Sequence, residues 1–295
     1  MRKRDCIYLY IGLLALAACT QEAPAPDSGS GDRMELRLRA EHPAGTRATA
    51  TAFEAGDRMG LYVVADTAAF NPSGNVVSNE LLTCNGADQS WTPRMPIYWS
   101  AGRYNLYAYY PYQAPVKSVT DMPFSVSTDQ STARTGDTLG GYEASDLLCA
   151  AREGVQATAS PVALTFHHAM SHLTIRLIKG EDYEGDMPTD ARVYVLSTVP
   201  QATIDLATGS ATKDIYGQEA TIRARQRSNY VFEAIVVPQR ILTRAPLIEV
   251  ETGGVSYMYE GIFHFRPGTD HLVSLVITNN PEKAELNVGG DVVGW

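Results

Sequence analysis

Three histidines that lie close together could bind a metal ion. His167, His168 and His172 fall within six residues, and imidazole is a common ligand of zinc. In an extended strand, however, the neighbouring side chains of His167 and His168 point to opposite faces. No cysteine or carboxylate accompanies the histidines at the spacing that metal sites use. We therefore expect no metal site here, and nothing else in the sequence calls for a cofactor.

No motif in the sequence marks a catalytic centre. It contains no Gly-x-Ser-x-Gly elbow, phosphate loop or His-Glu-x-x-His pair. The acidic residues are scattered and give no positive support for a glycosidase carboxylate pair. The aromatic block from Tyr98 to Tyr112 could stack a sugar, although aromatic side chains at alternating strand positions more often form core. We expect a non-enzymatic protein and keep a carbohydrate-binding surface lipoprotein as the alternative.

Cys19 is the residue best placed for covalent modification. A basic head of Arg2, Lys3 and Arg4 precedes an uncharged apolar run that ends in Leu16-Ala17-Ala18. That run is shorter than the ~20 residues of a membrane span. The pattern resembles a lipobox, in which a signal peptide (residues 1–18) is removed and the cysteine receives diacylglycerol and palmitate. The alternative is an ordinary secretory signal with an incidental cysteine.

The charge of the chain limits its partners. The formal net charge is −9, and removal of residues 1–18 takes away three basic residues and one acidic residue. A negative balance with no basic run argues against nucleic acid and against anionic lipid headgroups. Membrane attachment must then come from the lipid on Cys19. Residues 19–33, rich in Pro, Ser, Gly and Ala, are predicted to form a flexible tether.

Cys84 and Cys149 are the remaining cysteines once Cys6 has left with the signal and Cys19 is acylated. Export to an oxidising compartment permits a disulfide between them. Sequence alone does not bring their Cα atoms within bridging distance, so two separately buried thiols are an equal alternative.

Alternation of apolar and polar residues dominates the chain from Met34 onward and predicts an all-β fold. The first predicted strand covers Met34–Ala40. The later ones lie near residues 59–64, 104–110, 162–167, 172–177, 192–196, 220–224, 230–237, 247–250, 255–259 and 271–277. Short strands at this spacing favour β-sandwiches. The length suggests two, an N-terminal sandwich over 34–158 and a C-terminal one over 159–295.

Several segments resemble the fimbrillin family, the subunits of type V pili. The clearest is Phe53-Glu54-Ala55-Gly56-Asp57-Arg58-Met59-Gly60, which is similar to the family's Phe-x-x-Gly-Asp-x-hydrophobic-Gly entry into a strand. The others are Trp91, Pro96-Ile97-Tyr98-Trp99, Tyr107-Ala108-Tyr109-Tyr110-Pro111, Ser145-Asp146-Leu147-Leu148 and the run from Phe166 to Leu173. Beyond residue 180 the likeness is to general β character.

The resemblance implies two transthyretin-like β-sandwich domains and assembly by strand exchange with other pilus subunits. In such subunits proteolysis after an arginine frees the first strand, and a strand of another subunit fills the groove. The matching position here is Arg47-Ala48, in a loop of small residues. The alternative is that Arg47 is an ordinary loop arginine and the first strand stays in place.

The C-terminal segment is a candidate donor strand. Glu285-Leu286-Asn287-Val288 is followed by a Gly289-Gly290 hinge and by Val292, Val293 and Trp295. The alternative is a last strand docked in its own domain. The expected location is the outer membrane and cell surface, as part of a fimbrium. The sequence leaves open the stalk, tip or anchor role and whether the target of adhesion is a host protein or a glycan.

Overall fold

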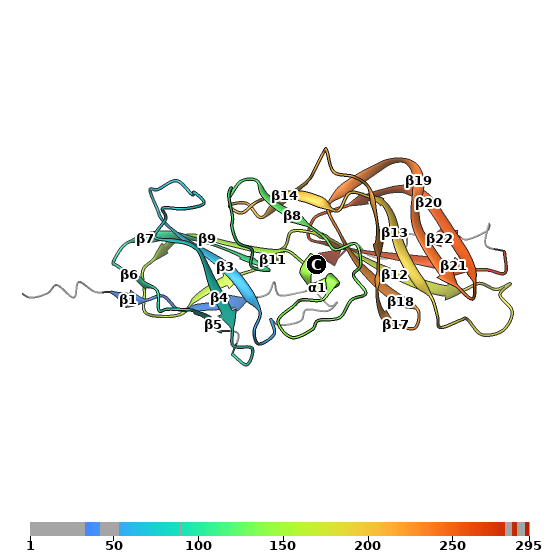
Figure 1. Ribbon diagram of the computed structural model, residues 1–295, viewed down its shortest axis with the longest axis horizontal. Helices are drawn as coiled ribbons and strands as arrows, with labels where there is room; N and C mark the ends of the chain where they lie inside the picture. Colours follow the sequence, from blue (N-terminus) through green and yellow to red (C-terminus); the bar gives the residue numbers. More distant parts are fainter. Residues whose placement is uncertain (1–32, 42–52, 89, 281–284, 288–292, 295) are drawn as a thin grey trace, which may run out of the picture. The chain divides into compact units, whose positions relative to one another are not determined.

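The computed structural model describes residues 33–41, 53–88, 90–280, 285–287 and 293–294 (Figure 1). Over these residues the chain is built mainly of β-strands in five sheets, which confirms the predicted all-β class. The described residues contain one helix, α1 (Gly141–Ser145). No helix among them has the length and apolar character needed to cross a membrane.

The largest sheet has eight strands and belongs to the first half of the chain. In spatial order they are β10 (Val162–Thr165), β2 (Leu38–Glu41), β5 (Ser90–Pro93), β4 (Val77–Cys84), β3 (Arg58–Ala65), β7 (Arg103–Tyr110), β9 (Leu148–Gln156) and β11 (His167–His168). All neighbours are antiparallel except β10 and β2, which are parallel. β10 also contacts β9, so the two ends of the sheet approach each other around an apolar core. β1 (Met34–Glu35) and β6 (Tyr98–Trp99) form a separate pair.

Two further sheets form a sandwich in the second half. One contains β17 (Arg225–Ser228), β18 (Val231–Val236), β12 (Ser171–Lys179) and β21 (Thr269–Ile277), with β22 (Glu285–Asn287) and β23 (Val293–Gly294) both paired to β21. The other contains β16 (Ala220–Arg223), β13 (Arg192–Thr198), β19 (Gln239–Thr252) and β20 (Val255–Phe265). Apolar side chains of both sheets share one core cluster. Alternate residues of β13 and β21 point into it, as period-two burial requires.

The first half of the chain also contributes to a sheet of the second half. β8 (Met122–Ser125) pairs with β14 (Gln201–Asp205), which pairs with β15 (Ser210–Lys213). The fully buried amide of Gln130 donates to the carbonyl of Ile235 at 2.7 Å and accepts from its N–H at 2.8 Å. The two halves are therefore connected by backbone pairing. The predicted boundary between residues 158 and 159 stays a prediction, and the eight-stranded sheet includes residues up to His168.

The glycines near the start of β3 are required by local geometry. Gly56 has a φ of +90°, which suits the turn before the strand. At Gly60 a Cβ atom would lie 2.4 Å from Cε1 of Tyr109 on the neighbouring strand β7. The glycine thus makes room for a buried aromatic ring.

The buried His271 gives the fold a defined pH dependence. Its Nε2 accepts a hydrogen bond from the N–H of Arg266 at 3.1 Å. Burial and then the positive charge of Arg266 lower the pKa of His271 from 6.5 to about 4. Between these two values the unfolded chain binds a proton that the folded chain does not, so the free energy of unfolding should fall as the pH is lowered through this window.

Urea unfolding at pH values from about 7 to about 4 should show this fall in the free energy of unfolding, and the fall should be smaller for His271→Gln. An equal dependence in both proteins would contradict the assignment.

Candidate functional site

The segment from Met34 to Glu41 contains two strands, where we predicted one over Met34–Ala40. The chain changes its hydrogen-bonding partners between β1 and β2. The N–H of Leu36 donates to the carbonyl of Ile97 at 2.8 Å, beside β6. The carbonyl of Arg37 accepts from the N–H of Val162 at 2.8 Å, beside β10. β2 then continues between β10 and β5, with both of its edges paired.

Apolar side chains on one face attach this segment to the core. Leu36, Leu38 and Ala40 are buried, whereas Arg37 and Arg39 are exposed. The two arginines pair with Glu35 and Glu41, and such exposed ion pairs contribute little to stability. Burial of each leucine is worth about 1.5–3 kcal/mol. The buried face of this segment therefore supplies most of the free energy that holds the segment in place.

Two tryptophans lie opposite this segment in the sheet register. Trp91 is paired with Leu38 and Trp99 with Met34. Side chains directly opposite each other in an antiparallel pair share one face, so the tryptophans support the segment from the neighbouring strands. Only 3% of Trp91 and 2% of Trp99 are exposed.

Burial of these aromatic residues bears on the carbohydrate-binding alternative. That alternative depended on exposure of Trp91, Trp99 and Tyr109, and Tyr109 is also fully buried. The Tyr109 hydroxyl is held between Asn79 and the carbonyl of Gln113, at 2.7 and 2.8 Å. A sugar cannot stack on a ring that the protein already covers, so the alternative loses the observation on which it depended.

A cavity of about 380 Å³ runs beside β2. Its apolar lining comes from Leu36, Leu38, Trp91, Pro93 and Pro161, and its polar lining from Glu35, Arg37, Arg39, Asp88, Ser90 and Thr92. The cavity extends from β2 toward β5 and the start of β10. The site is thus a strand seated in an apolar groove with spare volume along one side.

Phe53 is the first described residue after Glu41, and contacts with other aromatic rings hold it beside the groove. The Phe53 ring makes edge contacts with Trp91, Tyr110 and Phe166, with centroids 4.9–5.3 Å apart. One carboxylate oxygen of Asp57 accepts from the N–H of Glu54 at 2.9 Å, and the other accepts from Arg134 at 2.8 Å. These contacts explain why the Phe-x-x-Gly-Asp motif is needed. Arg134 was not found from the sequence, because it lies 77 residues from Asp57.

Removal of the Asp57 carboxylate should destabilise the fold. Asp57→Ala leaves the Arg134 guanidinium with Glu54 as its remaining carboxylate partner and the Glu54 N–H without this acceptor, and the loss of a hydrogen bond to a charged group typically costs about 1.5–3 kcal/mol. Urea unfolding at neutral pH would measure this loss in the free energy of unfolding. Asp137→Ala is the matched control, because Asp137 forms an exposed pair with Arg58 and should cost less than about 1 kcal/mol. Equal effects of the two substitutions would contradict the role of Asp57.

The residues predicted for lipidation and processing, Cys19, Arg47 and Ala48, lie outside the described residues, as do Val288, Val292 and Trp295. The backbone of the C-terminal segment is described in part. β22 pairs with Ser274–Val276 and β23 with Thr269–Asp270 on β21. This pairing is what the docked-strand alternative expects.

The three histidines do not converge. His168 Nδ1 lies 2.7 Å from Asp146, and the buried His172 lies 2.8 Å from Asp270, so each has a different carboxylate partner. His167 is exposed on β11. Within the part of the chain that the structure describes, no group of three or more His, Cys, Asp or Glu residues could hold a metal ion. His168 and His172 thus serve as hydrogen-bonding groups, each with its own carboxylate.

Cys84 and Cys149 are both free and buried, which answers the question of a disulfide between them. They lie in different core clusters. Burial raises the pKa of Cys149 to about 12 and also raises that of Cys84. Both thiols therefore stay protonated near neutral pH, which makes them poor nucleophiles.

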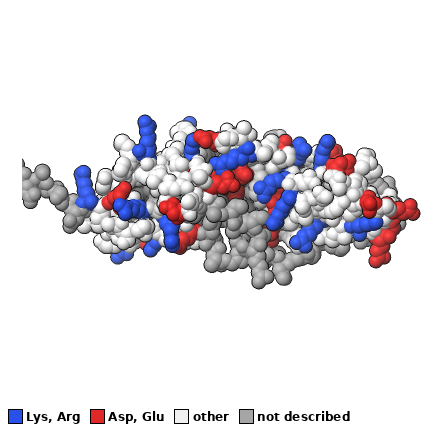
Figure 2. All heavy atoms as spheres, turned by 90° about the horizontal axis from the view of Figure 1, so that it is seen from below, with Lys and Arg blue, Asp and Glu red and all other residues white. Residues whose placement is uncertain are grey.

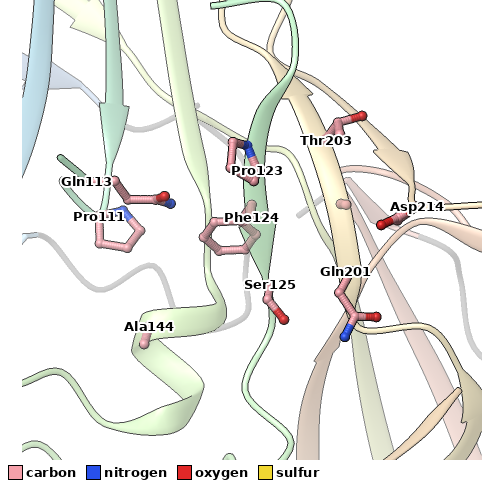
Figure 3. Close-up of a pocket in the computed structure, with 10 residues that line it drawn as sticks. Pro111, Gln113, Pro123, Phe124, Ser125, Ala144, Gln201, Thr203 and Asp214 are labelled. Carbon is pink, nitrogen blue, oxygen red and sulfur yellow. The ribbon is translucent and has the colours of Figure 1, made fainter. Parts of the chain in front are cut away.

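A second cavity, of about 520 Å³, lies between α1, β8 and β14 (Figure 3). Pro111, Pro123 and Phe124 line one side, and Gln201 and Asp214 the other. Asp214 is the one ionisable residue among those that line it. The cavity thus offers no pair of groups for acid–base catalysis.

The charged side chains of the molecule show no single-sign patch on the face drawn in Figure 2. Basic and acidic residues alternate across it. A continuous basic surface is what nucleic-acid binding would need.

Comparison with known proteins places the chain in a family. The family model described as fimbrillin-like matches residues 46–295. The chain is 25% identical over 219 residues to Fim1C of Bacteroides uniformis, a candidate fimbrium subunit, covering 71% of this chain and 67% of the relative.

Solved structures share the fold of this chain. A candidate cell adhesion protein of Bacteroides ovatus superposes with a TM-score of 0.69 at 19% identity, covering 89% of this chain and 98% of that one. A candidate cell adhesion protein of Bacteroides uniformis superposes with a TM-score of 0.67 at 21% identity, covering 90% of this chain and 99% of that one. The tip fimbrial protein Mfa3 of Porphyromonas gingivalis superposes with a TM-score of 0.54 at 8% identity, covering 89% of this chain and 99% of that one. At these identities the likeness shows the fold. The family model matches most of the chain, and so the chain belongs to the fimbrillin-like family.

Proposed function

We propose that this chain is a non-enzymatic surface lipoprotein that acts as a pilus subunit, assembles by β-strand exchange and supports adhesion. The observation that carries the proposal is the placement of β2. It is a short strand near the start of the described chain, inserted between two other strands and seated on apolar side chains. Its departure would open a groove between β10 and β5.

The chemistry of such a groove favours uptake of another strand. An empty site would present the unpaired backbone of β5 and β10 together with the apolar surface around Trp91. Exposed strand edges pair readily with an extended segment, which gains main-chain hydrogen bonds and side-chain pockets. The proposed partner is a strand of another pilus subunit.

Proteolysis after Arg47 would separate the segment from the rest of the chain. Arg47 lies between β2 and Phe53, and Phe53 is fixed by its own contacts. Cleavage there would therefore free β1 and β2 and leave the remaining chain attached. It would also separate the body from a lipid on Cys19, so a subunit that stays as a membrane anchor should escape cleavage.

The family and the relatives support the proposal at a coarser level. Fim1C is named as a candidate fimbrium subunit and Mfa3 as a tip fimbrial protein. The two structures with the higher TM-scores carry the description of candidate cell adhesion proteins. These relatives support a location at the cell surface, and we propose in addition that the chain is part of a fimbrium and is attached to the outer membrane by its lipid until processing.

Cleavage after Arg47 should start exchange. Limited digestion with an arginine-specific protease should give a new N-terminus at Ala48. A labelled peptide with the sequence of residues 33–41 should then enter the groove, and concentration-dependent polymers should form. Release of the original strand should shift the emission of Trp91 and Trp99 to longer wavelength, because both rings would become exposed to water. Peptide sequencing, fluorescence and size-exclusion chromatography are the measurements.

Arg47→Gln is the control for this experiment, and it should remain uncut at this position and take up no peptide. Cleavage of the wild-type chain at Arg47 that produced neither peptide uptake nor polymers would contradict strand exchange.

The lipid should depend on Cys19 alone. Expressed in a bacterium that processes lipoproteins and fed labelled palmitate, the wild-type chain should incorporate label and fractionate with membranes. Cys19→Ser should incorporate none, because the thiol that accepts the diacylglycerol is absent, whereas Cys84→Ala should keep the label. An unlabelled wild-type chain would favour the ordinary secretory signal instead.

A further inference from the structure

The two strands beside β2 are held in very different ways. On its other side β5 pairs with β4. In this ladder Pro93 lies opposite Leu82, and Trp91 lies opposite Cys84. β10 pairs, within the residues that the structure describes, with β2 alone. Removal of β2 would therefore leave β5 in the sheet but would remove all strand pairing from β10.

One side chain connects β10 to the opposite end of the sheet. Arg152 lies on β9 and donates from Nη1 to the carbonyl of Ala163 on β10 at 2.8 Å. β9 and β10 are in contact, although no ladder joins them. The guanidinium thus bridges β9 and β10, two neighbouring strands that no described backbone ladder joins.

Burial holds β10 against the core but does not fix its distance from β5. Val162 and Leu164 point inward and are 4% and 1% exposed. Apolar contacts of this kind are non-directional, so they resist outward movement more than movement along the core surface. Neighbouring strands lie about 4.8 Å apart, so β5 and β10 are separated by about 9.6 Å when β2 is present. An empty groove could close if β10 moved by about one strand spacing.

We propose that Arg152 is a positioning residue that keeps β10 in place as the far wall of the groove after β2 has left. This inference rests on the proposed strand exchange. The bond to Ala163 pulls β10 toward β9 and away from β5, which keeps the gap wide enough for one incoming strand. In the uncut chain β2 already fixes β10, so Arg152 has little to add there.

The inference predicts an effect that is confined to the processed chain. The full chain is cut after Arg47, and the affinity for a fluorescent peptide of residues 33–41 is measured by anisotropy. Arg152→Ala should weaken binding about threefold to tenfold, since a solvent-exposed hydrogen bond is typically worth a factor in this range. Arg152→Lys should recover much of the loss, because an ammonium group on a long side chain can donate to the same carbonyl.

Two controls separate positioning from general stability. The melting temperature of uncut Arg152→Ala should stay within about 3 °C of the wild type, as expected for a small change in stability. Arg176→Ala, at an exposed arginine on β12 in another sheet, should leave peptide binding unchanged. Equal weakening by Arg176→Ala would overturn the inference.

The remaining outcomes distinguish this inference from the function on which it rests. If the cut wild-type chain binds the peptide and Arg152→Ala binds it equally well, the role of Arg152 is wrong and strand exchange stands. If the cut wild-type chain binds no peptide, strand exchange itself is wrong, and the role of Arg152 falls with it.

Discussion

The pairing of β2 along both of its edges is the contact on which the first half of the molecule depends. β2 joins β10 to the rest of the eight-stranded sheet, and Leu36 just before β2 and Leu38 within it cover the core beside Trp91. Burial of the two leucines alone is worth about 3–6 kcal/mol, within a typical total stability of 5–15 kcal/mol. A subunit without a strand in this position would lose a large share of its stability. Occupancy of the groove is thus part of the folding of the subunit, whichever chain supplies the strand.

The sequence motifs that resemble the fimbrillin family have a common structural role. Trp91 and Trp99 support the first segment, and Phe53 is packed between Trp91, Tyr110 and Phe166. Asp57 and Arg134 secure the turn that follows Phe53. The aromatic residues that could have formed a sugar platform divide between two core clusters. Trp91, Trp99 and Tyr110 pack in the cluster beside the first segment, whereas Tyr107 and Tyr109 pack in the other. Buried aromatic rings are thus a common feature of the segments that carry the likeness.

Alternating burial made some strands predictable and left others hidden. Strands such as β3, β7, β12 and β21 carry enough buried residues to be located from the sequence. β4 was missed because most of it is half-buried on both faces, so it shows no alternation. The pairing of β8 with β14, the Asp57–Arg134 bond and the Arg152–Ala163 bond join residues that no local pattern connects. The groove could thus be anticipated from its first strand, but its walls and attachments could not. Cys19, Arg47 and Ala48 remain predictions.

The arrangement of β2 also determines how the sheet would respond to a pulling force. Hydrogen bonds in a sheet lie across the strands, and β2 is bonded to β10 on one edge and to β5 on the other. Tension along such a strand loads many of these bonds at once, in shear, whereas tension across a terminal strand would break them one after another. A strand paired on both edges is therefore a mechanically stronger link than a strand paired on one edge. Subunits joined through it would carry load through the sheet itself and not through the loops between strands.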